Sequence, residues 1–283
     1  MRSRARDAGR DAGLILAIVA IVNTTPTRAL VVSAHPDDME FGAAGTLAKW
    51  ADEGTEVMLC IATDGSTGTQ DRSMMGDRLA ALRADEASDA AAILGFKEIV
   101  WLGHRDGYVE YSLALRRDIA RVFRRFRPHR FMVMDPASTV EDRFVNHPDH
   151  RAVGQASLDT VLTAGTTPGH FPELLDEGLE PWRGMRELWI MGPGFKPVVS
   201  DISSTIERKI QALQCHASQL GDESEREEVE AWLREFAGAQ GAVAGFSYGE
   251  SFQIITQGPG FHDEEPLADD YLDLARAPSD PRA

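Results

Sequence analysis

Short apolar runs alternate with amphipathic segments along most of the chain. The runs have the length of strands, and the segments between them repeat apolar residues at helical spacing. The predicted strands cover residues 29–34, 56–63, 97–103, 130–135, 187–192, 198–202 and 251–256. The predicted helices cover residues 41–52, 77–94, 113–126, 148–162, 205–220 and 224–236. Because strands and helices alternate across short turns, we expect an α/β fold of one domain, with a Rossmann-like, mostly parallel sheet sandwiched by helices.

Two parts of the chain depart from this alternation. Residues 163–184 are rich in Pro and Gly and show little periodicity, which predicts a long loop that helps to shape a ligand pocket. Residues 28–258 are expected to form the domain, between an N-terminal extension at 1–27 and an acidic tail at 259–283. Within helix 113–126 the polar positions carry several arginines, including Arg124, which we expect on a solvated helix face.

Composition excludes several classes of protein. The chain has 283 residues, of which 43% are hydrophobic and 26% charged, as in globular proteins and unlike disordered, collagen-like or polytopic membrane chains. The net charge of −16 disfavours nucleic acid and anionic membranes as partners, so a small-molecule ligand is expected. The composition is compatible with a homo-oligomer. The two cysteines, Cys60 and Cys215, form no disulfide framework, which favours a reducing compartment.

The N-terminus carries a pattern that bears on location. Several arginines precede the apolar run 13–22, which is too short to span a bilayer but has the length of a signal-peptide core. No small-x-small cleavage site follows this run. We therefore expect a cytoplasmic protein without stable membrane insertion, and keep export by a signal peptide as the alternative.

Candidate chemistry follows two of the predicted strands. His35, Asp37 and Asp38 come directly after strand 29–34, where open α/β sheets place their ligands. His147 and His150 follow strand 130–135, on either side of Pro148 and Asp149. Pro148 suits a first helical turn, so the two histidines can project from nearby positions. Although Asp and Pro are common in turns, two His-Pro-Asp motifs after strands of one sheet predict a shared site.

The ligand types in these motifs suit zinc. His35, Asp38 and His150 would provide three protein ligands and leave a fourth position open, as a catalytic site requires. Another divalent metal such as Fe²⁺ would also be accepted by this set. Asp37 could take a proton from the activated water, and His147 could stabilise an oxyanion or protonate a leaving amine. With Asp149 expected to keep His147 charged, the parts describe metal-assisted hydrolysis of an amide or ester.

The stretch 29–154 resembles the PIG-L/LmbE family of zinc-dependent N-deacetylases. The resemblance rests on Ala34-His-Pro-Asp-Asp-Met-Glu-Phe-Gly42, Arg83-Ala-Asp-Glu86 and His147-Pro-Asp-His-Arg-Ala-Val-Gly154. It continues in Lys209-Ile-Gln-Ala-Leu-Gln-Cys-His-Ala-Ser-Gln219 and Tyr248-Gly-Glu-Ser-Phe252. The family includes enzymes that deacetylate N-acetylglucosamine-containing glycolipids, thiol precursors, chitobiose and antibiotic precursors. The resemblance therefore implies that residues 28–258 are a deacetylase domain, with 163–184 as its substrate loop.

The resemblance also implies roles for single residues. It makes His35, Asp38 and His150 the metal ligands and Asp37 the general base. It implies that His147 stabilises the tetrahedral oxyanion and that Asp149 is the partner of His147. Two further positions, Arg83 and Asp106, resemble residues that line the sugar pocket. Asp64 is added to these candidate substrate residues because it falls at the end of strand 56–63, facing the site.

We expect a zinc N-deacetylase acting on an N-acylated glucosamine or a similar amino sugar. A second hypothesis is a metal-dependent amidase that cleaves a sugar–thiol conjugate. A third is a Rossmann-like nucleotide-binding module, but the turn after the first strand holds His-Pro-Asp-Asp instead of a glycine-rich phosphate turn. A sugar-binding protein without catalysis is the fourth.

Overall fold

The computed structural model describes residues 20–21, 24–141, 144–192, 194 and 197–256. Its strands are β1 (Ala20–Ile21), β2 (Arg28–Ser33), β3 (Glu56–Thr63), β4 (Glu98–His104), β5 (Arg130–Val133), β6 (Val140–Glu141), β7 (Phe144–Val145), β8 (Glu187–Met191), β9 (Pro197–Asp201) and β10 (Gly249–Thr256). Its helices are α1 (Asp38–Gly42), α2 (Ala44–Asp52), α3 (Asp77–Leu94), α4 (Leu113–Phe126), α5 (Pro148–Asp159), the π-helix η1 (Thr160–Ala164), α6 (Glu173–Asp176), α7 (Ile206–Cys215), α8 (Ala217–Leu220) and α9 (Glu223–Ala244).

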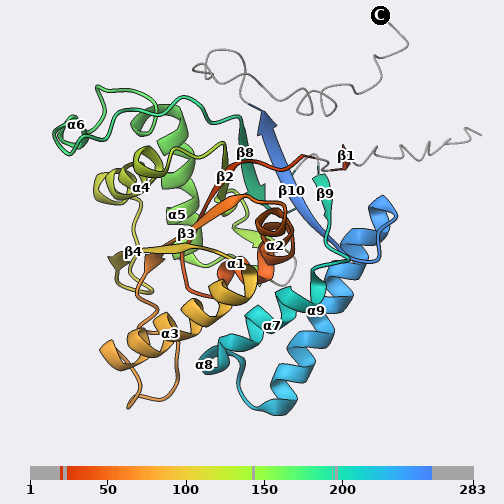
Figure 1. Ribbon diagram of the computed structural model, residues 1–283. Helices are drawn as coiled ribbons and strands as arrows, with labels where there is room; N and C mark the ends of the chain where they lie inside the picture. Colours follow the sequence, from red (N-terminus) through yellow and green to blue (C-terminus); the bar gives the residue numbers. More distant parts are fainter. Residues whose placement is uncertain (1–19, 22–23, 142–143, 193, 195–196, 257–283) are drawn as a thin grey trace, which may run out of the picture.

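One mixed sheet runs through the molecule (Figure 1). Its eight strands have the order β1-β9-β10-β8-β5-β2-β3-β4, and β6 and β7 form a separate hairpin. From β8 through β5 and β2 to β4 all neighbours are parallel, with Leu30 of β2 between Met58 of β3 and Phe131 of β5. Within the described part of this sheet, the antiparallel pairs are those of β10 with β8 and β9. The expected single-domain, mostly parallel α/β fold is confirmed.

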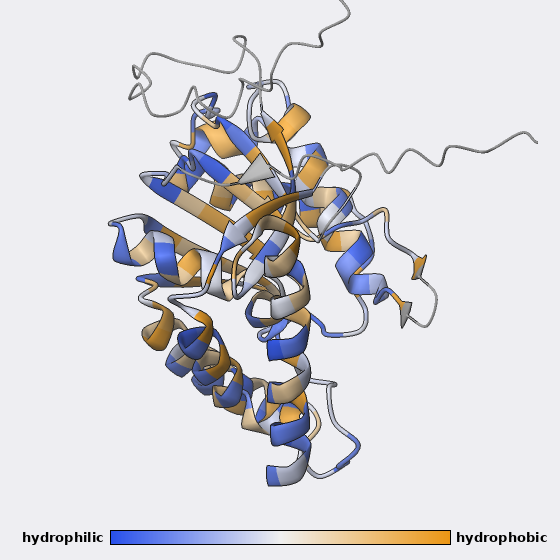
Figure 2. Ribbon diagram, turned by 90° about the vertical axis from the view of Figure 1, so that its right-hand side faces the viewer, coloured by the Kyte–Doolittle hydropathy of each residue, from blue (hydrophilic) through white to orange (hydrophobic). Residues whose placement is uncertain are grey.

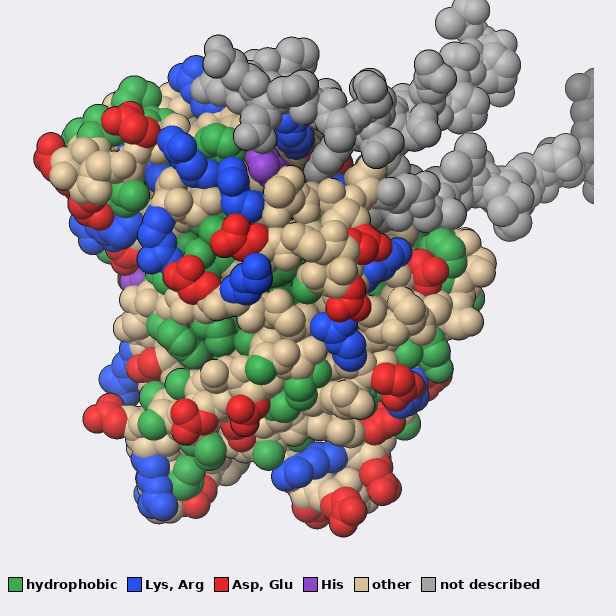
Figure 3. Space-filling view, viewed as in Figure 1, with side chains coloured by type: hydrophobic (Ala, Val, Ile, Leu, Met, Phe, Trp, Pro, Cys, Tyr) green, Lys and Arg blue, Asp and Glu red, His purple; other side chains and the backbone are tan. Residues whose placement is uncertain are grey.

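Helices cover both faces of this sheet. Leu30 and Val32 point to the face covered by α4 and α5, while Ala29 and Val31 point to the face covered by α2, α3 and α7. Successive strand residues are thus buried on opposite faces, which explains why these strands are continuously apolar. Figure 2 shows the hydrophobic residues concentrated in the central strands. On the face shown in Figure 3, acidic and basic side chains lie interspersed.

Several elements differ from the prediction. The helix expected at 41–52 is two helices, because the chain breaks at Ala43 (φ −148°) and α1 already begins at Asp38. The helix expected at 148–162 changes from α to π geometry after Asp159. Helix α9 continues to Ala244, beyond the expected 236. The sequence reading missed β1, β6 and β7, which are too short to show a periodic pattern.

Arg124 does not lie on a solvated face, as we had expected. Its side chain is buried, and the guanidinium donates hydrogen bonds to backbone carbonyls of the segment after α5. These acceptors are the carbonyl oxygens of Ala164, Thr167, His170 and Leu179. The segment 163–184 is therefore ordered around one cation, and it contains the short helix α6.

Residues before 28 contact the sheet of the domain. Ala20 and Ile21 pair in parallel with β9, and Thr24 accepts hydrogen bonds from the buried Arg130. The remainder of the apolar run at 13–22 and the acidic tail at 259–283 lie outside the described residues. Among the helices of the described part, none has the length and apolar character to cross a membrane.

Candidate metal centre and active site

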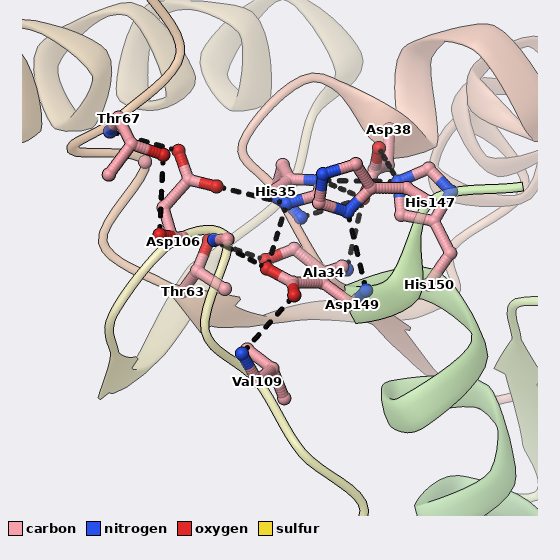
Figure 4. Close-up of polar contacts among 12 residues, drawn as sticks. Ala34, His35, Asp38, Thr63, Thr67, Asp106, Val109, His147, Asp149 and His150 are labelled. Atoms are coloured by element: carbon pink, nitrogen blue, oxygen red, sulfur yellow. Dashed lines mark hydrogen bonds and ion pairs between the residues drawn. The ribbon is translucent and has the colours of Figure 1, made fainter.

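The two His-Pro-Asp motifs meet at the carboxyl ends of the parallel strands. His35 follows β2, Asp106 follows β4, and Asp149 and His150 lie in the first turn of α5. Figure 4 shows the His35 imidazole between the Asp106 and Asp149 carboxylates on one side and His147, His150 and Asp38 on the other. The expected meeting of the two motifs therefore occurs.

The two ring nitrogens of His35 face different partners. Nε2 lies 3.2 Å from Asp106 Oδ1 and 3.3 Å from Asp149 Oδ2, so it can donate its proton to these carboxylates. Nδ1 lies 3.1 Å from His150 Nε2 and 3.5 Å from Asp38 Oδ2. A proton on Nε2 leaves the lone pair of Nδ1 directed at His150 and Asp38, which fixes the ring as carboxylates do for metal-ligating histidines.

Asp38 is held by the turn that it ends. Its Oδ2 accepts the backbone N–H groups of Ala34 and His35 at 3.0 and 2.6 Å. Its Oδ1 lies 3.0 Å from His150 Nε2. One carboxylate oxygen thus fixes the strand-to-helix turn, and the other faces the histidines.

Asn146 orients His150 and was missed by the sequence analysis. Its Oδ1 lies 3.1 Å from His150 Nδ1, and its Nδ2 donates to the carbonyls of Asp135 and Ser138. The amide direction is therefore set by two carbonyls, which makes Oδ1 the acceptor for the His150 Nδ1 proton. His150 Nε2 is then unprotonated, and its lone pair can bind a metal ion. Asn146 lies four residues before His150, in the loop that leads into α5, and this position was the signal in the sequence that could have identified it.

Helix α5 approaches the end of β5 very closely. A Cβ atom on Gly154 would lie 2.6 Å from the carbonyl oxygen of Met134, so only glycine allows this packing. The close contact fixes the start of α5, and with it Asp149 and His150, against the strand end.

Charges around His35 favour a cation. Burial alone would lower the pKa of His35, but Asp38, Asp106 and Asp149 together raise it to about 12. Burial alone would raise the pKa of Asp106, but His35 and its other partners lower it to about 2. His35 and His150 likewise hold the pKa of the buried Asp38 below its usual range. The carboxylates are therefore ionised, and either a proton or a metal ion on His35 would balance them.

Two sets of side chains around His35 have the composition of a metal site: His35 with His147 and His150, and His35 with Asp106 and Asp149. On the Nε2 side, Asp149 is 0% and Asp106 4% exposed, and both carboxylates accept backbone N–H groups, from Gly107, Val109 and Thr67. On the Nδ1 side, Asp38 and His150 line an open cavity of about 440 Å³. A catalytic metal needs a reachable open position, so the Nδ1 side fits and the enclosed Nε2 side does not.

The donor atoms on the Nδ1 side fit a divalent metal. His35 Nδ1, His150 Nε2 and Asp38 Oδ1 are joined by separations of 3.1 and 3.0 Å. Tetrahedral zinc with N and O ligands at about 2.0–2.2 Å places its donors roughly 3.3–3.6 Å apart. A slight opening of the set would accommodate the ion.

Asp37, which is partly exposed, and the buried Arg83 form an ion pair beside these donors. Arg83 Nη2 donates to Asp37 Oδ1 at 3.0 Å, and Nη1 donates to the carbonyl of Gly65. Arg83 Nη1 also lies 3.7 Å from Asp106 Oδ2. Arg83 therefore contacts the carboxylates of both Asp37 and Asp106.

None of the three expected substrate residues lines the 440 Å³ cavity. Arg83 is buried behind Asp37, and Asp106 contacts His35. Asp64 Oδ1 accepts the backbone N–H groups of Ser66 and Asp106, and so joins the loops after β3 and β4. These side chains shape the site from within the fold.

The expected pairing of Asp149 with His147 is not formed. The Asp149 carboxylate faces His35 and accepts the N–H groups of Gly107 and Val109 at 2.8 and 3.2 Å. Its backbone N–H instead donates to His147 Nδ1, because His147 caps α5. Burial, together with the nearby His35, lowers the pKa of His147. The lowered pKa favours the neutral imidazole, and the acceptor role of Nδ1 favours the tautomer with its proton on Nε2.

The segment 163–184 lies away from the cavity. Trp182 donates its indole N–H to the carbonyl of Pro128, just before β5, which places the segment at the amino ends of the strands. No residue of the segment lines the 440 Å³ cavity, so its expected role as a substrate loop stays a prediction. The cavity is lined instead by two of the donor residues, Asp38 and His150, and by Phe41, Met134, Asp135, Ser138, Met191, Trp232 and Phe236, among others.

Fold and site together define the class: a hydrolytic enzyme of the α/β type, with a candidate divalent-metal site at the carboxyl edge of its sheet. The chain belongs to the PIG-L family. The family model described as GlcNAc-PI de-N-acetylase matches residues 30–161. Diacetylchitobiose deacetylase from Thermococcus kodakarensis is 34% identical over 233 residues, which cover 81% of this chain and 83% of that protein.

Other relatives agree. A 1D-myo-inositol 2-acetamido-2-deoxy-alpha-D-glucopyranoside deacetylase from Nakamurella multipartita is 34% identical over 177 residues, covering 50% of this chain and 57% of that protein. The structure of N,N'-diacetylchitobiose deacetylase from Pyrococcus horikoshii, with an inhibitor, superposes with a TM-score of 0.76 at 33% identity, covering 86% and 88% of the two chains. The chain is thus a hydrolase of the deacetylase type, which acts on carbon–nitrogen bonds other than peptide bonds.

Proposed function

We propose that this protein removes the acetyl group from the amide nitrogen of a small N-acetylglucosamine-type sugar. A divalent cation, zinc or another such as Fe²⁺, would be held by His35 Nδ1, Asp38 Oδ1 and His150 Nε2. The observation that carries the proposal is the convergence of these three donors, of which Asp38 and His150 line an open cavity. The names of the relatives support an amino-sugar amide as the bond that is cleaved.

When bound, such a cation supplies Lewis-acid activation of the amide carbonyl and of water. The chain's own contribution begins with orientation. Asp106 and Asp149 fix the His35 ring through Nε2, and Asn146 fixes the His150 ring through Nδ1. Each histidine can therefore present one unprotonated nitrogen toward Asp38 without rearrangement.

Asp37 serves as the proton acceptor in the proposed mechanism. It directly precedes Asp38, and Arg83 holds its Oδ1 at 3.0 Å. A water molecule that attacks the acetyl carbonyl must lose a proton, and an ionised carboxylate beside the metal donors can accept it. The same proton can then pass from Asp37 to the sugar nitrogen as the carbon–nitrogen bond breaks, which balances the reaction.

His147 serves as a neutral hydrogen-bond donor. Its Nδ1 accepts the backbone N–H of Asp149, so its Nε2–H is available to the carbonyl oxygen as negative charge develops there. This assignment replaces the charged imidazole expected from the sequence. It requires no carboxylate partner for His147.

We also propose a cytoplasmic location and an uncharged small molecule as substrate. Cys60 and Cys215 are both free thiols, as is usual in a reducing compartment. The net charge of −16 would repel a polyanionic substrate.

An assay of both products tests the function. The purified, zinc-loaded protein is given a disaccharide of N-acetylglucosamine, and acetate and free amine are measured with His150→Ala as the control. We expect acetate and amine in equal amounts from the wild type and neither from the variant. Release of a monosaccharide without acetate would contradict the proposal. Cleavage of a larger acyl group or a thiol conjugate in preference to acetate would favour the amidase reading instead.

A further inference from the structure

A buried ion pair connects the C-terminal part of the chain to α1 and α2, which pack against α7 (Figure 1). Lys209 of α7 and Glu250 of β10 are 1% and 2% exposed, and Lys209 Nζ lies 2.6 Å from Glu250 Oε1. Neither side chain lines the 440 Å³ cavity. A buried ion pair is often no more stabilising than apolar side chains of the same volume, so its role lies in the groups that it contacts.

The pair holds both sides of the break between α1 and α2. Lys209 Nζ donates to the carbonyl oxygen of Phe41, in the last turn of α1, at 2.8 Å. The Glu250 carboxylate accepts the backbone N–H groups of Gly45 and Thr46, in the first turn of α2, at 3.0 and 2.8 Å. Helix ends leave such backbone groups without partners inside the helix. The ammonium group therefore caps the end of α1, and the carboxylate caps the start of α2.

A second contact holds α1 in the same place. The His216 imidazole and the Glu40 carboxylate are both buried, and His216 Nε2 lies 3.3 Å from Glu40 Oε1. Glu40 is the middle residue of α1, and His216 directly follows α7. Because α1 has only five residues, it is too short to be stable alone, and its orientation depends on such tertiary contacts.

The orientation of α1 affects Asp37 more than Asp38. Asp37 is the N-cap residue of α1, its side chain makes no capping hydrogen bond, and its carboxylate contacts Arg83 instead. Asp38 is anchored to the end of β2, because its carboxylate accepts the N–H groups of Ala34 and His35. A displacement of α1 would therefore move Asp37 and leave the metal donor in place. Misplacing a reacting group by about 1 Å can cost roughly 10²-fold in rate.

We propose that Lys209 and Glu250 are positioning residues, which hold α1 so that the Asp37 carboxylate stays aligned with the metal donors. The inference rests on the proposed function, in which Asp37 accepts the proton, and extends that function to residues outside the site. It gives a role to segments 209–219 and 248–252, which take no part in the proposed chemistry.

Kinetics and zinc binding of charge-removing variants test the inference. Lys209→Met and Glu250→Gln each remove one charge and keep the shape of the side chain. Because a single buried charge without its partner can prevent folding, Lys209→Met/Glu250→Gln removes both charges together. We expect each folded variant to lose roughly tenfold to hundredfold in kcat, while KM and zinc affinity change less than about threefold. A loss confined to KM, or a parallel loss of kcat and zinc affinity, would overturn the inference.

Combination with Asp37→Asn shows whether the pair acts through Asp37. In the Asp37→Asn background, Lys209→Met/Glu250→Gln should lower the residual kcat less than about twofold, because the aligned group is already lost. Losses that multiply would overturn the inference.

Two controls separate positioning from stability. Lys49→Met is the same substitution at a partly exposed lysine of α2, and it should keep the kcat of the wild type. Arg124→Ala removes a buried cation whose acceptors lie in segment 163–184, and it should also keep this kcat. An equal loss of kcat in Arg124→Ala would attribute the effect to lowered stability and overturn the inference.

Hydrogen exchange separates this inference from the proposed function, since it needs no turnover. In Lys209→Met/Glu250→Gln the amides of residues 38–46 should exchange about tenfold faster or more, while β2 and β3 keep the exchange rates of the wild type. Unchanged exchange at residues 38–46 would overturn the inference whether or not acetate is released. Faster exchange there, in a protein whose wild type releases no acetate from any N-acetylated sugar, would contradict the proposed function and still support the hold of the pair on α1.

Discussion

The Nε2 atom of His35 lies 3.3 Å from Oδ2 of Asp149. This contact joins the His-Pro-Asp motif after β2 to the motif at the start of α5. It also assigns Asp149 to the orientation of a candidate metal ligand, because the same carboxylate is fixed by the N–H groups of Gly107 and Val109. The second motif therefore contributes His150 as a donor and Asp149 as support for the first motif.

Replacing Asp149 should weaken metal binding. Asp149→Asn removes a charged acceptor from His35 Nε2, and loss of such a partner typically costs roughly 10–100-fold in metal affinity. Competition with a chelator measures this affinity. Asp85→Asn, the same change on the exposed side of α3, is the control and should have no effect. Unchanged affinity in Asp149→Asn would show that the contact does not orient the ligand.

His147 should act through a neutral N–H. His147→Ala should lower kcat by roughly 10²–10³, as expected for the loss of one oxyanion donor, while zinc remains bound. His147→Gln can still donate an N–H and should recover part of this loss. Since the pKa of His147 is lowered, the alkaline limb of the pH–rate profile should not depend on it. An alkaline limb that disappears in His147→Gln would show that the imidazolium is the active form.

The metal-free protein should lose stability as pH rises. The folded state holds a proton on His35 up to a pKa of about 12, whereas the unfolded state releases it near 6.5. The stabilisation is therefore complete below about pH 6.5 and is lost progressively above it. His216, whose pKa is raised by Glu40 despite its burial, contributes in the same sense.

Thermal unfolding of metal-free protein between about pH 6.5 and 9 measures this loss. The midpoint should fall with pH, and His35→Asn should remove most of the slope. The zinc-loaded protein should show less dependence, because the metal displaces the His35 proton. A midpoint that rises with pH in the metal-free wild type would contradict the charge balance described for the site.

Arg124 should stabilise the fold without affecting catalysis. Arg124→Ala leaves its four carbonyl acceptors without their charged donor, which should lower the free energy of unfolding by roughly 2–4 kcal/mol. Denaturant unfolding measures the change, and Arg117→Ala, at a partly exposed position of α4, should cost less than about 0.5 kcal/mol. At a temperature where Arg124→Ala stays folded, kcat and KM should be unchanged. An altered substrate preference in Arg124→Ala would instead show that segment 163–184 helps to shape the substrate pocket.

The fold could be predicted from the sequence where an apolar stripe defines a helix or an apolar run defines a strand. The helices at 77–94 and 113–126 have the expected ends, because their apolar positions pack on the sheet at regular spacing. The break at Ala43 was not readable, since it depends on the turn that Asp38 holds through Ala34 and His35. Arg124 was misjudged because its partners are backbone carbonyls, which leave no pattern in the sequence.

The candidate site was predictable in its composition and only partly in its geometry. The two motifs, placed after strands of one sheet, were enough to bring His35, Asp38 and His150 together. The direction of the Asp149 carboxylate depends on N–H groups of the loop after β4, which lie 42 and 40 residues earlier in the chain. Trp232 joins the cavity through the packing of α9, which no local motif announces.

The side of His35 on which the metal binds is the central claim. A crystal of the zinc-loaded protein, with anomalous scattering recorded at the zinc absorption edge, tests it most directly. We predict one peak per chain on the Nδ1 side, in contact with His35, Asp38 and His150 and open to the cavity. A single peak on the Nε2 side, between His35, Asp106 and Asp149, would contradict the assignment of ligands and the mechanism built on it.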